Sequence, residues 1–436
     1  MTGDVAPHAG AAPHPGAAPP AGVAPPAGVV PDAGATPDGE RLARAVLGRL
    51  TEPGRLDLWL LVHEVGAVEA VHRLREGPAP APLREQVAPR LDAADVAAEA
   101  TESLRQCRRL GGRFVVPGDA EWPEAALHSL VLLAARRAGD DGPRRGCDVA
   151  PPLGLWVRGP HSLTEATATS VAVVGARAAT GYGAHVAAEL GYGLADRGWA
   201  VVSGGAYGID AAAHRGALAA EGVTVVVLAC GVDTAYPVGH TNLFEKIADE
   251  GLLVSEWCPG SSPRRQRFLV RNRVIAALTV GTVVVEAAAR SGALATARRA
   301  HDLGRVLMAV PGPVTSAMSV GAHQMVRERD ARLVTCASEV VEEVGRIGTD
   351  LAARPQAPPT VRDALGREAD AVLDVLDRRG RSVTEIAVDA GVSVPVTERI
   401  LQALADAGLV TRSGEGYRIG DDASGTGTRA VLPPVR

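Results

Sequence analysis

The stretch VAVVGARAATGYG at residues 171–183 predicts a buried strand, a glycine turn and the start of a helix. The stretch AVVSGGAYGIDAAAH at residues 200–214 repeats that plan. Four more runs rich in β-branched residues follow along the chain: TVVVLACGVDTAYP, LLVSEWCPG, TVVVEAAARSGALATA and RVLMAVPGPV. Because most of these runs lead into a glycine-rich turn and an alanine-rich helix, we expect an α/β fold with a doubly wound sheet of mainly parallel strands.

The segments before this core predict a tail and a helical module. Residues 1–40 repeat alanine, proline and glycine with almost no charge, a composition typical of a disordered tail. Residues 41–110 carry apolar residues at helical spacing with short glycine-containing turns, which favours a helix-hairpin-helix or SAM-like module. Such a module can grip a DNA backbone, but its hairpins carry little positive charge, so we favour a scaffold for protein contacts. The core domain is then assigned to residues 111–345.

The segments after the core predict a linker, a small domain and a tail. A polar, proline-containing linker is assigned to residues 346–363 and a flexible tail to residues 421–436. Residues 364–420 show three helical segments followed by LVTRSGEGYRI, the pattern of a winged helix. From residue 382 to residue 420 there are three arginines and five acids, a net charge of −2 that is unsuited to a DNA major groove. We therefore expect this domain to contact protein or to regulate, rather than to read duplex DNA.

Composition argues against several classes of partner. The chain has 436 residues and a net charge of −5, so a polyanion has to be bound by a local patch. The cysteines, at positions 107, 147, 230, 258 and 336, lack metal-site spacing, so we expect reduced thiols and no metal. The N-terminus lacks the pattern of a secretory signal, and no apolar run approaches the ~18 residues that span a bilayer. We expect a cytoplasmic protein without a membrane partner.

A cluster of arginines precedes the strand predicted at residues 282–285. The sequence RRQRFLVRNR at residues 264–273 holds five arginines, no acid and one of only three phenylalanines, Phe268. We predict a basic loop whose arginines contact phosphates, while Phe268, with Tyr182 or Tyr207, offers a face for base stacking; such surfaces suit single strands better than duplex. The alternative for any one arginine is an ion pair. Its candidate partners are Asp210, Glu256 and Glu286.

Three glycine turns fall at the carboxyl ends of predicted strands, where sheets of this kind bind ligands. They are Gly175 with residues 180–183, residues 203–208, and Ser291 with Gly292. Each can precede a helix, so free amides and the helix dipole can meet an anion. No GxGxxG fingerprint with its partner acid and no GxxxxGK(S/T) loop occurs, so we expect neither NAD nor ATP, but we do expect phosphate in some other form.

No catalytic arrangement can be assigned from spacing. The residues near strand ends that an enzyme could use are Ser203, Asp210, His214, Asp233, Glu256 and Glu286. Asp210 and His214 lie one helical turn apart and so face the same way. We interpret them as an acid at a helix N-terminus and a structural histidine rather than as a catalytic pair.

In their order and spacing, several motifs resemble the DNA-processing protein A (DprA/Smf) family, strongly from Arg113 to about Val334. The motifs are VAVVGARAATGYG, SGGAYGIDAAAHRGAL, GVDTAYP, LLVSEW, FLVRNRVIAAL, VVVEAAARSGALATA and AVPGPV. The resemblance implies a Rossmann-like core that binds single-stranded DNA without sequence preference, forms a homodimer, and has neither catalytic activity nor cofactor. It also implies protection of incoming strands and loading of the RecA recombinase in natural transformation.

The family's single-strand pocket carries over to this chain motif by motif. The matching residues are Gly175, Arg177, Ser203, Gly204, Gly208, Phe268, Arg271, Asn272, Arg273, Ser291, Gly292 and Thr296. Lysines that often flank the family's FxxRNR segment are replaced here by Arg264, Arg265 and Arg267, which serve phosphates at least as well. Two departures are that Ala176 takes the place of a serine and His323 that of an asparagine. The second departure weakens the match of the loop at residues 321–331.

Two other functions fit parts of the sequence. A Rossmann-like nucleotide phosphoribohydrolase would use Glu286 as its acid, although the PGGxGT loop that such enzymes pair with a glutamate is absent. A transcription regulator would act through the winged helix, and the net charge of −2 in that segment argues against it.

Overall fold

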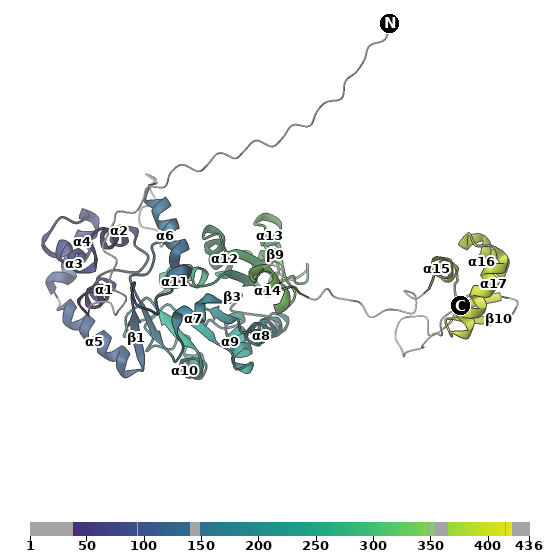
Figure 1. Cartoon of the computed structure of the whole chain (residues 1–436), viewed down its shortest axis with the longest axis horizontal. Helices are drawn as coiled ribbons and strands as arrows, with labels where there is room; N and C mark the ends of the chain where they lie inside the picture. Colours follow the sequence, from purple (N-terminus) through teal and green to yellow (C-terminus); the bar gives the residue numbers. More distant parts are fainter. Residues whose placement is uncertain are drawn as a thin grey trace, which may run out of the picture. The chain divides into compact units, whose positions relative to one another are not determined.

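The computed structural model describes residues 38–93, 95–139, 149–346, 349–352, 365–414 and 416–420. The chain divides after Ala352 into two compact units, which are described one at a time (Figure 1). Apart from residues 38–40, the predicted tails lie outside the described residues, and so do residues 347–348 and 353–363 of the predicted linker. None of the described helices is long and apolar enough to cross a membrane.

Helices α1 to α5 open the first unit. They are α1 (Asp38–Leu50), α2 (Leu56–Val65), α3 (Ala67–Glu76), α4 (Ala81–Ala93) and α5 (Val96–Arg109). Gly66 joins α2 to α3 at φ +81°, a backbone conformation that residues with a side chain rarely adopt. Apolar side chains at helical spacing, such as Leu47 and Leu74, are buried in a core that continues onto the sheet at Trp156. The N-terminal helices therefore pack into the same compact unit as the sheet.

A sheet of nine described strands forms the middle of the first unit. The strands are β1 (Gly112–Val115), β2 (Leu155–Arg158), β3 (Ser170–Val174), β4 (Ala200–Ser203), β5 (Thr224–Leu228), β6 (Leu252–Ser255), β7 (Gly281–Val284), β8 (Val306–Ala309) and β9 (Arg332–Leu333). Their spatial order is β1-β2-β6-β5-β4-β3-β7-β8-β9. β1 and β2 pair antiparallel, as do β2 and β6, and all pairs from β6 to β9 are parallel. The β-branched runs form β3 to β8, so the predicted α/β fold with a mainly parallel sheet is confirmed.

Helices cover both faces of this sheet (Figure 1). The helices on one face are α6 (Glu124–Ala138), α7 (Leu163–Ala168), α11 (Arg265–Ala277), α12 (Ala293–Asp302) and α13 (Val320–Glu328). Those on the other face are α8 (Gly181–Ala195), α9 (Ile209–Ala219), α10 (Thr241–Glu250), α14 (Ala337–Val344) and the N-terminal helices. Val174 is buried on the first face and its neighbour Val173 on the second. Because alternate residues of a strand point to opposite faces, strands covered on both sides appear in the sequence as continuous apolar runs.

The direction in which strands are added reverses next to β3. Strands β4, β5 and β6 lie on one side of β3, while β7, β8 and β9 lie on the other. At such a reversal in an open α/β sheet, the connections that follow two neighbouring strands run in opposite directions. They form a crevice between them at the carboxyl ends of the strands. A ligand pocket is therefore expected at the carboxyl end of β3, between the turns that follow β4 and β7.

The arginine cluster is helical, which corrects the predicted basic loop. Helix α11 begins at Arg265 and contains most of the RRQRFLVRNR segment. Arginine, glutamine, leucine and alanine favour helix, and no glycine or proline interrupts residues 265–277. From Arg271 onward every residue of α11 is buried, so the solvent-facing part of the helix is its first two turns. The groups that bind its buried arginines lie far away along the chain. The sequence of the segment alone therefore gives no sign that these arginines are buried, and a run of arginines suggests a surface loop.

The second unit contains α15 (Arg367–Asp374), α16 (Val383–Ala390), α17 (Val394–Asp406) and the antiparallel strands β10 (Val410–Ser413) and β11 (Gly416–Ile419). A capping box begins α16: the Ser382 hydroxyl accepts from the Glu385 amide, and the Glu385 carboxylate accepts from the Ser382 amide. Gly391 ends α16 in the left-handed conformation. Ile386 and Leu401 are buried in a core that belongs to this unit alone among the described residues.

Candidate nucleic-acid interface

A pocket of about 550 Å³ opens at the carboxyl ends of the parallel strands. Its lining comes from the turns after β3, β4 and β5, from Pro263, Arg264 and helix α11, and from the turn before α12 with the start of that helix. These segments meet around β3, where the direction of strand addition reverses. The pocket therefore lies at the position where doubly wound sheets bind ligands.

The edge of this pocket combines exposed guanidinium groups with aromatic rings. Arg177, Arg264 and Arg265 line the pocket and are exposed. The guanidinium carbon of Arg177 lies 5.2 Å from the centre of the half-buried Phe268 ring, within the range of a cation–π contact. The centre of the Tyr236 ring lies 5.6 Å from that of Phe268, with 51° between the ring planes. The same surface thus offers positive charge for phosphates and aromatic faces for bases.

Arg271 lines the pocket and also ties two strands together. Its side chain is buried, and Nη1 donates to the carbonyl of Gly204 at 2.9 Å and to the carbonyl of Val227. Gly204 follows β4 and Val227 lies in β5, so the guanidinium joins neighbouring parallel strands at their carboxyl ends. A Cβ at Gly204 would lie 2.4 Å from Nη2, so the glycine makes room for this contact. Burial lowers the pKa of Arg271 to about 10, which leaves the group charged at neutral pH.

Asp210 is the one acid among the described residues that line the pocket. It lies in the first turn of α9 and accepts a hydrogen bond from the Ala206 amide at 3.3 Å. Burial raises the pKa of this carboxyl, and the charge of Arg271 opposes that rise. His214, one turn further along α9, is buried with Nδ1 2.7 Å from the Thr224 hydroxyl. This geometry matches an acid at a helix N-terminus and a structural histidine.

The pocket brings together most of the residues assigned from the motifs. They are Gly175, Arg177, Arg264, Arg265, Phe268, Arg271, Asn272, Ser291, Gly292 and Thr296. Ser203, Gly204 and Gly208 do not line it. The buried Ser203 hydroxyl donates to the Val173 carbonyl at 2.6 Å, and a Cβ at Gly208 (φ +79°) would lie 2.2 Å from the Ala176 carbonyl oxygen. Ser203 thus joins the ends of β3 and β4, Gly208 lets the turns after these strands approach each other, and Gly204 makes room for Arg271, which corrects the assignment of all three to the pocket wall.

Arg267 contacts the N-terminal helices instead of the pocket, which corrects its assignment. Its Nη2 and Nε donate to the two carboxylate oxygens of Glu52 at 2.6 and 3.0 Å, and Nη1 donates to the Ser262 carbonyl at 2.8 Å. Glu52 also accepts from Trp257 Nε1 at 2.9 Å. Because Glu52 follows α1, this ion pair fastens the first turn of α11 to the N-terminal helices. Sequence reasoning missed the pair, whose two members lie 215 residues apart.

Arg273 is buried in the core, which corrects its assignment as a DNA contact. Its Nη2 donates to Glu256 Oε1 at 2.7 Å, and both side chains are at most 4% exposed. Glu256 is one of the ion-pair partners that the sequence suggested, and for Arg273 that alternative is confirmed. Burial raises the pKa of Glu256, and the charge of Arg273 opposes that rise. Nε and Nη1 of Arg273 and Oε2 of Glu256 have no hydrogen-bond partner among the described residues.

Tyr236 is the aromatic residue that motif reasoning left out of the site. Tyr182 and Tyr207, suggested from the sequence as stacking faces, do not line the pocket. The Tyr182 hydroxyl donates to the Pro311 carbonyl at 2.6 Å, and the Tyr207 ring packs edge-on against His240 with 4.5 Å between ring centres. Tyr236 belongs to the GVDTAYP motif after β5. The rule that selected the glycine turns, proximity to the carboxyl end of a strand, could have found it.

The carboxylate of Glu286 forms hydrogen bonds within the protein instead of facing a ligand. Its buried carboxylate accepts the Thr180 amide at 2.9 Å and the Thr180 hydroxyl at 2.6 Å. A Cβ at Gly183 would lie 2.3 Å from Oε2, so helix α8 approaches this carboxylate closely. A phosphoribohydrolase would need Glu286 to face its substrate, and the contacts with Thr180 argue against that alternative.

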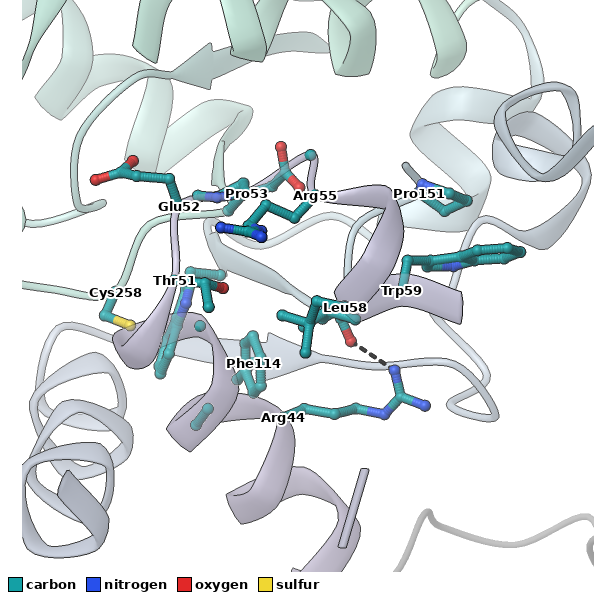
Figure 2. A pocket seen from close by; sticks show the side chains of 17 residues that line it. Arg44, Thr51, Glu52, Pro53, Arg55, Leu58, Trp59, Phe114, Pro151 and Cys258 are labelled. Carbon is teal, nitrogen blue, oxygen red and sulfur yellow. Dashed lines mark hydrogen bonds between the residues drawn. The ribbon is translucent and has the colours of Figure 1, made fainter. Parts of the chain in front are cut away.

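A much smaller cavity lies between the N-terminal helices and the antiparallel edge of the sheet (Figure 2). Its volume is about 30 Å³, and a water molecule needs roughly 10–15 Å³. Arg44, at its edge, donates to the Leu153 carbonyl at 2.9 Å. Burial raises the pKa of the Cys258 thiol to about 11, so this thiol is unreactive at neutral pH. Across the described ranges, no cluster of His, Cys, Asp and Glu side chains could hold a metal ion.

The fold and the pocket define a doubly wound α/β protein with a cationic, aromatic-edged pocket at the point where its sheet reverses. The model of the family described as DNA recombination-mediator protein A matches residues 114–345. A relative in Mycobacterium tuberculosis that carries the DprA name is 48% identical over 350 residues, which cover 80% of this chain and 86% of the relative. This chain belongs to the DNA recombination-mediator protein A family, known as DprA or Smf.

Streptococcus pneumoniae provides a second relative and a solved structure. Its DNA processing protein DprA is 41% identical over 173 residues, which cover 40% of this chain and 61% of that protein. The X-ray structure of the S. pneumoniae protein matches with a TM-score of 0.55 and 27% identity, and covers 72% of this chain and all of the solved chain. The mixed α/β fold with its mostly parallel sheet is therefore shared with a solved member of the family.

Proposed function

We propose that this chain binds single-stranded DNA, without reading its base sequence, in the pocket at the carboxyl end of β3. The observation that carries this proposal is the cluster of Arg177, Phe268 and Tyr236 beside the exposed Arg264 and Arg265. Guanidinium groups neutralise backbone phosphates, and every base has a face that can stack on an aromatic ring. Such a surface binds strands of any sequence.

The form of the pocket favours single strands over duplex. Phe268 and Tyr236 line a concave pocket of about 550 Å³, which an unstacked base can enter. In a duplex the faces of the bases are covered by their neighbours, so a duplex would offer the rings of this pocket no base face on which to stack. The proposed activity is binding rather than chemistry, because the one acid in the described lining, Asp210, is held by the Ala206 amide and lies beside Arg271.

The proposed role extends to protection of single strands and to assistance of the RecA recombinase in DNA uptake and recombination in the cytoplasm. Its support is membership in a family that is described as recombination mediators. A homodimer is part of the same proposal, since two copies would present two such pockets to one strand. The sequence resemblance that implies these roles spans the residues that carry the pocket.

We assign the second unit to the winged-helix class on the order of its elements, α15 to α17 followed by the hairpin β10-β11. Helix α17, the equivalent of a recognition helix, carries Glu398 and Asp406 against the single arginine Arg399. Because these acids repel phosphates, we propose that this unit contacts protein. We assign α1 to α5 to a SAM-like or helix-hairpin-helix scaffold, in which Gly66 turns the chain between α2 and α3.

A titration of the full-length protein against single- and double-stranded oligonucleotides tests the proposed function. We expect the single strand to bind at least about tenfold more tightly than the duplex, and oligonucleotides of different sequence to bind about equally. Between about 50 mM and about 200 mM salt the affinity should fall steeply, because each phosphate contact releases counterions. Tighter binding of duplex would favour a regulator that acts through the second unit, and absence of binding to both would contradict the proposal.

A further inference from the structure

A second polar pocket, of about 170 Å³, lies where α1 and α4 meet the segment between β6 and α11. Its charged lining residues are Arg49, Arg90, Arg267 and one acid among the described residues, Glu52. Among the described lining residues the one aromatic ring is that of Trp257, which is buried, with the Arg267 guanidinium 5.5 Å from the ring centre. This second pocket therefore offers positive charge but no face on which a base could stack.

The acid in the second pocket is neutralised within the fold. Both carboxylate oxygens of Glu52 accept hydrogen bonds from Arg267, and one of them also accepts from Trp257. Burial alone would raise the pKa of Glu52, but these hydrogen bonds and the charges of Arg267 and Arg264 lower it. Glu52 therefore stays ionised and paired at neutral pH, and it cancels the charge of Arg267.

The two remaining arginines share a single carboxylate. Arg49 Nη1 lies 3.4 Å and Arg90 Nη2 lies 3.6 Å from the same oxygen of Glu99. Arg49 also donates hydrogen bonds to the Ser103 hydroxyl and to the Pro259 carbonyl. Arg90 donates to the Arg49 carbonyl and its side chain is 49% exposed. Arg90 is thus the accessible source of the excess positive charge.

The segment at residues 261–268 separates the two pockets. Arg264, Arg265 and Phe268 line the pocket at β3, while Ser261 and Arg267 line the second pocket. Arg264 is exposed, and its charge acts on Glu52 in the second pocket. Positive charge therefore continues from the first pocket to the second across the start of α11, within one compact unit.

We propose that the second pocket binds a backbone phosphate of the same single strand whose bases occupy the pocket at β3. The strand would leave the aromatic cluster, pass the exposed Arg264, and place a phosphate against Arg90. This inference rests on the proposed function and adds to it a direction for the strand, toward the N-terminal helices. The affinity of the protein should then rise with oligonucleotide length until the strand reaches Arg90.

Binding of oligothymidylates of graded length tests this second contact. Lengths from about 5 to about 20 nucleotides bracket the roughly 4–16 nucleotides that single-strand binding folds occupy. For Arg90→Gln, which keeps a donor for the Arg49 carbonyl, we expect unchanged affinity for the shortest strand and about 5- to 10-fold weaker binding of the longest. The slope of log affinity against log salt should become shallower by about 0.7 for the long strand, the loss of one phosphate contact.

Two further variants separate a specific contact from a general loss of charge. Arg90→Lys keeps the charge and should retain most of the gain in affinity with length. Arg105→Gln removes an exposed arginine of α5 that lines neither pocket and should bind like the unaltered protein at every length. Identical length dependence in Arg90→Gln and the unaltered protein, or an equal loss for short and long strands, would overturn the inference while the proposed function stands. Failure of the unaltered protein to bind any length would overturn both.

Discussion

Replacement of Arg177 by glutamine is expected to weaken the binding of single-stranded DNA by about 10- to 100-fold, with the fold unchanged. Arg177 is exposed at the edge of the pocket, so its loss removes one charge-assisted phosphate contact, worth roughly 1.5–3 kcal/mol, without opening the core. A tenfold change corresponds to about 1.4 kcal/mol. The slope of log affinity against log salt should become shallower by about 0.7. Fluorescence anisotropy with a labelled oligonucleotide measures both quantities.

Phe268→Ala provides the complementary readout for the same pocket. Loss of a stacking face should weaken binding by roughly 1–3 kcal/mol and leave the salt dependence unchanged, because no phosphate contact is removed. Tyr192→Ala is the control, since Tyr192 is an exposed aromatic residue of α8 that does not line the pocket. If Arg177→Gln and Phe268→Ala both bind as tightly as Tyr192→Ala, the strand does not occupy this pocket.

Arg273→Ala is expected to destabilise the first unit by about 3–5 kcal/mol, because it leaves Glu256 buried without its partner. The truncation also opens a cavity where a fully buried side chain stood. Urea unfolding measured by circular dichroism gives the change in the free energy of unfolding.

A double replacement separates the unpaired charge from the lost packing. Arg273→Met combined with Glu256→Leu removes both charges and fills most of the volume, so it should recover much of the stability that Arg273→Ala loses. A loss below about 1 kcal/mol for Arg273→Ala would show that the buried pair contributes little, and would contradict the structural role assigned to Arg273.

The sheet could be predicted from the sequence because its signals are local. A strand covered on both faces, such as β3 with Val173 and Val174, appears as a continuous apolar run whatever surrounds it. The glycine turn that follows at Gly175 then locates the carboxyl end of the strand, and with it the pocket. Arg177 and Phe268 could be assigned to that pocket from motifs in the same local stretches.

The roles of the remaining arginines could not be read from the sequence because their partners are distant. Arg271 binds the carbonyl of Gly204, 67 residues away, and Arg267 binds Glu52, 215 residues away. A run of arginines without acids resembles a solvated loop until those partners are known. Arg267 and Arg273 therefore form ion pairs within the fold. Arg271 lines the pocket and also links β4 to β5 through hydrogen bonds.

Photo-crosslinking reports where the bases of a bound strand lie, and so tests whether they occupy the pocket at β3. A single-stranded oligonucleotide that contains halogenated uracils would be irradiated with the full-length protein, and the modified peptides identified by mass spectrometry. We expect crosslinks at Phe268 or Tyr236 that are lost in the presence of excess unlabelled single strand. Crosslinks confined to residues 365–420, with none at those two rings, would contradict it.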